Sequence, residues 1–259
     1  MSTQITTELV KELRDKTGIS VMQCRKALEE ALGDMEKAIA ILKKTSASIA
    51  EKKMGREAKD GAVAVKELNG KATLVALHCE TDFVSKNEDF TQLLNTLLEK
   101  AAASGIETLA TEAKDLIDPI IQKTGEKIEL GEVAVISGDV IGSYVHSGKK
   151  AVVVSLSGGN SELAKDIAMH IAAMRPEYIK DNEVSAETVA MMREIFEKEV
   201  ESVDKPAEIK QKMLEGKIAT YFKEKTLVNQ PFIKDGDMTV GALLAKNNAD
   251  IKEVKTCFI

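Results

Sequence analysis

The sequence is poor in the residues on which metal sites, base stacking and nucleic-acid binding depend. Among its 259 residues are no Trp, three Tyr, six Phe, three His and three Cys, and the formal net charge is −6. A nucleic-acid-binding protein normally has a basic face, and one that binds single strands adds stacking aromatic residues. The composition therefore predicts no direct binding of nucleic acid.

The few cysteines and histidines are too scattered to predict a metal site. Cys24, Cys79 and Cys257 include no pair at metal-ligand spacing, and the histidines lack a second ligand at a suitable interval. An odd number of separated thiols is typical of a reducing compartment. No apolar run reaches the length of a membrane span, and the first residues lack the pattern of a signal peptide. We expect a cytoplasmic protein with no cofactor, no metal and no membrane contact.

Two glycine-containing segments resemble anion-binding loops only in part. In the segment from Gly142 to Lys149 the glycines are six apart, and Lys150 occupies the place of the Ser or Thr that holds the metal. Ser157-Gly158-Gly159-Asn160 stands before a helix but lacks the dinucleotide fingerprint, which favours a tight turn. Because no nucleophile, base or phosphate loop is evident, the sequence predicts a protein that is not an enzyme. A hydrolase or transferase with an unrecognised site is one alternative.

Residues 1–45 predict three short helices. The first ends at Gly18, and Ser20 with Gln23 forms a capping box for the second. Asp34 caps the third. A module of this size is typical of docking units, since it is too small to enclose a catalytic cleft. The charged stretch 46–60 then predicts a linker, partly helical.

Two later parts of the chain repeat the order strand, turn, strand, helix. Asn69-Gly70, the strongest short hairpin signal, joins the strands of the first copy, and Ser147-Gly148 joins those of the second. The helices that follow are predicted over 87–103 and 161–174. This repeat predicts two related α+β core subdomains, each with an antiparallel sheet covered by helices.

Residues 185–226 predict two amphipathic helices around Pro206, which form an antiparallel helical hairpin or coiled coil. The tail then returns to the second sheet. The fold class predicted for the whole chain is therefore α+β. Its predicted parts are a helical domain (1–45), a linker (46–60), core subdomain N (61–139), core subdomain C (140–184 and 227–259) and the helical hairpin (185–226).

The two copies differ in the connection that leads from the second strand to the helix. In the first copy the segment 79–87 intervenes and contains Thr81, Asp82, Phe83 and Val84. An aromatic residue on a loop held by a rigid scaffold suits recognition. The alternative is that Phe83 and Val84 fold back over the core, since aromatic residues usually bury their large apolar area.

Four ordered motifs make the chain resemble the bacterial translation elongation factor Ts family, over nearly its whole length. The motifs are Glu80-Thr81-Asp82-Phe83-Val84 with Asn87, Thr17 to Leu28 continuing to Gly33-Asp34, Ala168-Met169-His170-Ile171-Ala172-Ala173, and Gln230-Pro231-Phe232. The resemblance implies that the N-terminal helices form a ubiquitin-associated-like domain. It also implies that the chain is a guanine nucleotide exchange factor for elongation factor Tu.

The resemblance implies particular contacts with this partner. Thr81 to Val84 would enter its nucleotide-binding domain, where Phe83 acts as a wedge and the bound Mg²⁺ is displaced. Val21 and Met22 would dock the helical domain, although both could instead be core residues. His146 and its hairpin would meet another domain of the partner, and the helical hairpin mediates self-association in some members.

The chain also departs from the family pattern. Val21-Met22 stands in place of two methionines, Met174-Arg175 in place of smaller residues, and no glycine-containing segment with a terminal helix follows the final strand. We expect these differences to tune affinity, with one partner contact fewer. The alternative to an exchange factor is a protein-binding adaptor without exchange activity.

Overall fold

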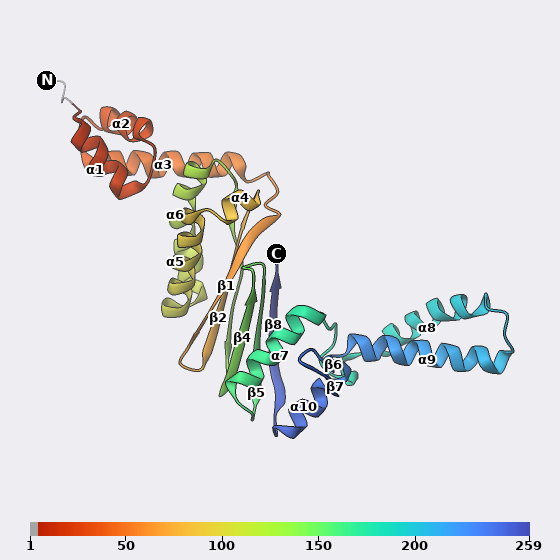
Figure 1. Ribbon diagram of the computed structural model, residues 1–259. Coiled ribbons are helices and arrows are strands. Elements are labelled where there is room, and N and C mark those ends of the chain that lie inside the picture. Colours follow the sequence, from red (N-terminus) through yellow and green to blue (C-terminus); the bar gives the residue numbers. More distant parts are fainter. Residues whose placement is uncertain (1–4) are drawn as a thin grey trace. The chain divides into compact units, whose positions relative to one another are not determined.

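The computed structural model describes residues 5–259, so residues 1–4 of the predicted helical domain lie outside the described part. The chain divides into two compact units that both combine helices with antiparallel strands (Figure 1). The α+β fold class is therefore confirmed. Unit 1 comprises residues 1–136, 145–151 and 255–259, and unit 2 comprises 137–144 and 152–254.

Unit 1 begins with a small helical module built from three helices. Gln23 N–H donates to Ser20 Oγ, and Lys37 N–H donates to the Asp34 carboxylate, so both predicted caps are confirmed. The apolar faces of the helices meet in one core around Leu13, Cys24 and Leu28. The helices are α1 (Thr7–Thr17), α2 (Val21–Glu30) and α3 (Met35–Lys53).

The third helix does not end where the linker was expected to begin, near residue 46. It continues to Lys53, because the small side chains of Ser46 and Ala50 are buried where α3 packs against α6 (Ile106–Thr124). The Ser46 hydroxyl also donates to the side chain of Gln122 on α6. The stretch 46–60, expected to be a partly helical linker, is therefore helical as far as Lys53, and Ala50 contributes to the core of unit 1.

The first sheet has the strand order β1-β2-β3, with the predicted hairpin at its edge. Asn69 and Gly70 have φ of +52° and +70°, the combination that a two-residue type I′ turn requires. Helix α5 packs on the hairpin and α6 packs on α5, which encloses a core around Val75, Phe90 and Leu97. The elements are β1 (Asp60–Leu68), β2 (Lys71–Cys79), β3 (Ile128–Ser137) and α5 (Glu88–Ser104).

The second sheet, of order β4-β5-β8, repeats this arrangement, with the second strand of a hairpin at its centre. Ser147 and Gly148 have φ of +52° and +66°, nearly the values of the first turn. Helix α7 covers the sheet, and a Cβ on Gly142 would lie 2.3 Å from the Lys165 backbone N of that helix. The elements are β4 (Val140–His146), β5 (Lys150–Ser157), α7 (Ser161–Met174) and β8 (Asp250–Phe258).

Unit 2 also contains the predicted helical hairpin, formed by α8 (Ala186–Glu201) and α9 (Ala207–Lys225) (Figure 1). The two helices pack side by side, with the rings of Phe196 and Tyr221 edge to face at 5.8 Å. The remaining elements are η1 (Asp181–Glu183), η2 (Leu227–Asn229), β6 (Pro231–Phe232), β7 (Asp235–Thr239) and α10 (Val240–Lys246).

A buried histidine joins two of the sequence motifs in unit 2. His170 of α7 is fully buried, and its Nδ1 accepts from Ile233 N–H at 3.2 Å. The ring proton is therefore on Nε2, which donates to Gln230 Oε1 at 2.9 Å. Gln230 Nε2 in turn donates to the Glu224 carbonyl at 2.6 Å. This chain of bonds fastens the end of α9 to α7 and uses His170 in its neutral form.

We expect this histidine to make the stability of unit 2 depend on pH. Burial lowers the pKa of His170 below its ordinary value of 6.5, against the opposing effect of the Gln230 bond. The unfolded chain therefore takes up a proton at a higher pH than the folded chain does. The stability is fully present above about pH 6.5 and is lost as the pH falls toward the folded pKa.

This pH dependence can be measured from urea unfolding midpoints between pH 7.5 and 5. His170→Gln should show a flatter dependence than the wild type, because it removes the titrating group. His146→Gln, at an exposed histidine, makes the same substitution while leaving His170 in place and is the matched control. Equal slopes for the wild type and His170→Gln would contradict the assignment.

Candidate functional site

A one-turn helix, α4 (Asp82–Ser85), leads from β2 to α5 and separates the two apolar residues of the differing connection. Phe83 is 82% exposed, whereas Val84 is buried in the core of unit 1. The interpretation in which Phe83 folds back over the core is therefore wrong, and for Val84 it is confirmed. Val84 anchors the turn, and Phe83 presents its ring to solvent.

The N-terminal side of α4 is clamped to the segment that precedes β3. Thr81 donates twice to the Glu126 carboxylate, from its backbone N–H at 2.9 Å and from its hydroxyl at 2.6 Å. In return, Lys127 N–H donates to Glu80 Oε1 at 2.6 Å and holds the pKa of this carboxyl below its usual range. Arg56 lies 3.2 Å from the same oxygen. Because hydrogen bonds to charged groups are the stronger ones, these contacts fix the entry to α4.

The turn itself is polar around the exposed ring. Asp82 is exposed and accepts a hydrogen bond from Lys86 Nζ at 2.7 Å, which raises the pKa of Lys86. The Ser85 hydroxyl donates to the Asp82 carbonyl at 3.2 Å. Phe83 is therefore an exposed apolar side chain on a turn whose backbone is held by hydrogen bonds and whose neighbours in sequence include the charged pair Asp82–Lys86.

Val21 and Met22 lie at the first positions of α2 and are 49% and 83% exposed. The reading of these two residues as core is therefore wrong. The residues before them fix the turn: Thr17 Oγ1 donates to the Leu13 carbonyl at 2.7 Å, and Ile19 is buried. The start of α2 presents an apolar and flexible Met side chain, which suits an adaptable protein contact.

His146, the third predicted contact, is exposed at the end of β4. Its carbonyl accepts from Lys149 N–H at 3.0 Å, and the Lys149 side chain lies 3.2 Å from Ser85 Oγ of α4. One residue thus connects the His146 turn with the Phe83 turn. Val21 and Met22 lie on the surface of the helical module, which has its own separate core.

Neither glycine-containing segment forms a phosphate loop. Gly142 lies in β4, where the backbone of α7 approaches it closely, and Gly148 lies in the hairpin turn. Asn160 caps α7 by accepting from Leu163 N–H at 2.9 Å, which leaves the preceding Gly158-Gly159 as a tight turn. Close packing and tight turns therefore explain why glycines occur in both segments.

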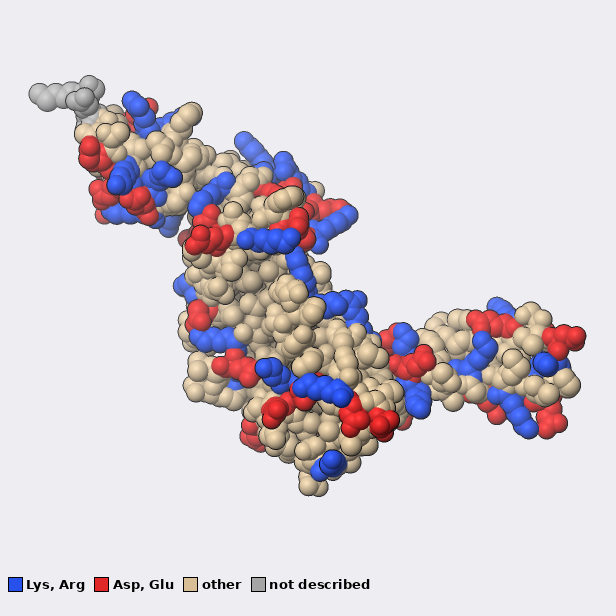
Figure 2. All heavy atoms as spheres, viewed as in Figure 1, with Lys and Arg blue, Asp and Glu red and all other residues tan. Residues whose placement is uncertain are grey.

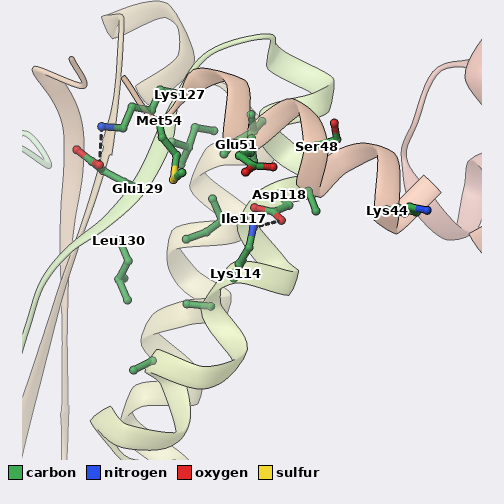
Figure 3. A pocket seen from close by; sticks show the side chains of 16 residues that line it. Lys44, Ser48, Glu51, Met54, Lys114, Ile117, Asp118, Lys127, Glu129 and Leu130 are labelled. Atoms are coloured by element: carbon green, nitrogen blue, oxygen red, sulfur yellow. Dashed lines mark hydrogen bonds and ion pairs between the residues drawn. The ribbon is translucent and has the colours of Figure 1, made fainter. Parts of the chain in front are cut away.

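A hollow of about 810 Å³ lies between α3, α6 and β3 in unit 1 (Figure 3). Nine of the 16 lining residues are apolar, seven of them Ala or Ile, and four of the six charged residues form two ion pairs. Lys114 lies 2.6 Å from Asp118, and Lys127 lies 2.7 Å from Glu129. No His or Cys is among the residues that line it.

The surface shows no broad field of one charge on the face drawn in Figure 2, where acidic and basic side chains are interspersed. Within residues 5–259, no group of three or more His, Cys, Asp or Glu side chains could hold a metal ion. No helix in the same range is long and apolar enough to cross a membrane.

Comparisons with known proteins agree with the motifs that surround these exposed residues. The model of the family described as elongation factor TS matches residues 80–258. An elongation factor Ts of Hahella chejuensis is 42% identical over 254 residues, which cover 95% of this chain and 89% of that protein. Those of Aeromonas hydrophila and Pseudomonas fluorescens are also 42% identical, and 88% of each is covered. The chain therefore belongs to the elongation factor Ts family.

Proposed function

We propose that the chain is a guanine nucleotide exchange factor for elongation factor Tu, acting in the cytoplasm during translation elongation and catalysing no reaction of its own. The observation that supports this most directly is Phe83, an exposed aromatic ring on a clamped turn. A Phe side chain left in water forgoes about 1.5–3 kcal/mol of burial free energy. A partner that buries the ring recovers this energy without first having to order the loop.

In this proposal Thr81, Asp82 and Phe83 enter the nucleotide-binding domain of elongation factor Tu, while Val84 holds the turn from below. The ring acts as a wedge that disturbs the site of the bound Mg²⁺. In P-loop GTPases this ion bridges the nucleotide to the protein and neutralises the phosphate charge. Its displacement leaves anionic oxygens poorly compensated, and every ~1.4 kcal/mol lost weakens nucleotide binding about tenfold.

The coupling between the two ligands of elongation factor Tu is reciprocal. If this chain lowers the affinity for GDP by a given factor, GDP lowers the affinity for this chain by the same factor. Rebinding of nucleotide therefore releases the exchange factor, which can act again.

The other parts of the chain would position Phe83 on elongation factor Tu. We propose that the ubiquitin-associated-like helical domain docks through Val21 and Met22, and that the core subdomains present Phe83 and His146. The helical hairpin carries exposed apolar residues that support self-association. These are Met191, Ile195 and Ile209.

The direct test is release of a fluorescent GDP analogue from elongation factor Tu in the presence of excess unlabelled GDP. Substoichiometric amounts of the chain should accelerate release, because one molecule serves many turnovers. Binding to elongation factor Tu without acceleration would instead favour the adaptor. Hydrolysis of GTP by the chain alone would favour the enzyme alternative.

The exposed start of α2 gives a prediction about affinity. The double substitution Val21→Ser/Met22→Ser should raise the half-saturating concentration about tenfold, equivalent to ~1.4 kcal/mol, because it removes an apolar contact. The maximal release rate should stay unchanged, since Phe83 is intact. Leu32→Ser, which changes an exposed residue at the other end of α2, is the control. A lower maximal rate in the double variant would contradict a purely docking role.

A further inference from the structure

The turn between β4 and β5 reaches the end of α4 through one ammonium group. Lys149 Nζ lies 2.6 Å from Asp60 Oδ1, 2.5 Å from the Gly61 carbonyl oxygen and 3.2 Å from Ser85 Oγ. A lysine ammonium has three donors, so each of them has an acceptor here. Ser85 is the buried last residue of α4, two positions after Phe83. The ammonium group therefore joins the start of β1 to the end of the turn that carries the exposed ring.

Hydrogen bonds also hold the backbone around Lys149. Val63 N–H donates to the Gly148 carbonyl at 2.8 Å, and Ile259 N–H donates to the Lys149 carbonyl at 2.8 Å. The side chains of Lys149 and Asp60 are about two-thirds buried. Burial raises the pKa of Asp60, but the hydrogen bonds from Lys149 Nζ and Gly61 N–H contribute to a net lowering below its usual range. A partly buried ion pair is screened by salt less than an exposed pair, and here every ammonium donor has an acceptor.

We propose that Lys149 is a positioning residue for Phe83. Glu126 fixes the beginning of α4 through Thr81, and Lys149 fixes its end through Ser85. Together they hold the aromatic ring at one angle to the body of unit 1. The backbone N–H of Lys149 also closes the turn that carries His146, and this bond remains when the side chain is replaced. This inference deepens the proposed exchange function and rests on it.

The test replaces Lys149 with Met, which keeps the length of the side chain and removes its donors. At saturating concentrations of the chain, Lys149→Met should lower the maximal rate of GDP release about tenfold, because small misplacements of a reacting group are costly. The half-saturating concentration should be unchanged, since Val21 and Met22 still dock. Lys150→Met, at the neighbouring residue, removes the same charge and should behave like the wild type.

Two further measurements separate positioning from a loss of stability. In the Phe83→Ala background, Lys149→Met should have no additional effect on release, because the residue acts through the ring. Without any partner, the amide hydrogens of residues 82–86 should exchange faster in Lys149→Met than in Lys150→Met.

The outcomes distinguish this role from the function on which it rests. A wild-type chain that does not accelerate release overturns the proposed function, and this role with it. A different result would overturn the positioning role alone. In that result the wild type is active and Phe83→Ala is slow, but Lys149→Met equals Lys150→Met in GDP release and in amide exchange.

Discussion

We expect Phe83→Ala to lower the maximal rate of GDP release from elongation factor Tu about a hundredfold, since an aromatic anchor at an interface contributes on the order of 3 kcal/mol. The free energy of unfolding should change by less than about 0.5 kcal/mol, because the ring contributes little to the core when it is exposed. Stopped-flow release of a fluorescent GDP analogue measures the first quantity, and urea unfolding measures the second.

Three further variants sharpen this prediction. Phe83→Leu keeps part of the apolar volume and should fall between the wild type and Phe83→Ala. Asp82→Asn removes the charge that pairs with Lys86 and separates the role of the acid from that of the ring. Met54→Ala, at an exposed apolar residue on another part of unit 1, should be neutral. Equal release rates for the wild type and Phe83→Ala would remove the wedge from the mechanism.

The second large effect concerns Phe90, seven residues along the chain and fully buried in the first turn of α5. Phe90→Ala should lower the free energy of unfolding by about 3–5 kcal/mol, because it leaves a cavity among packed side chains. That is a large fraction of the ~5–15 kcal/mol by which domains are usually stable. Urea unfolding monitored by circular dichroism gives the value.

Phe83→Ala is the matched control for Phe90→Ala, since both remove the same atoms from the same residue type. If Phe90→Ala does not fold, Phe90→Leu provides a smaller step in the same direction. A stability loss for Phe83→Ala as large as that for the Phe90 variants would show that the exposed ring belongs to the core after all.

The features that could be predicted from the sequence depend on neighbouring residues. Asn69-Gly70 predicts its hairpin because both residues accept positive φ, and Ser20 and Asp34 predict helix starts because their side chains bond to N–H groups three residues later. The spacing of hydrophobic residues by three and four likewise predicts α7 over its full length.

The features that could not be predicted depend on distant contacts. Helix α3 continues past residue 46 because Ser46 meets Gln122, which is 76 residues away in sequence. The four-residue α4 has no capping side chain of its own, since the Thr81 hydroxyl bonds to Glu126, 45 residues away. Whether Phe83 or Val84 faces the core follows from the direction of this clamped turn, which no local pattern specifies.

The unbroken course of α3 has a consequence for how the two apolar contacts cooperate. Its 19 residues span roughly 28 Å at 1.5 Å per residue. A helix, unlike a flexible tether, fixes both the distance and the angle between its ends. If the partner binds both proposed contacts, binding at the start of α2 would place the aromatic ring at a high effective concentration. Inserting one residue into α3 would rotate one end of the helix relative to the other by about 100°. We expect this insertion to abolish the gain in effective concentration although the residues of both proposed contacts are unchanged.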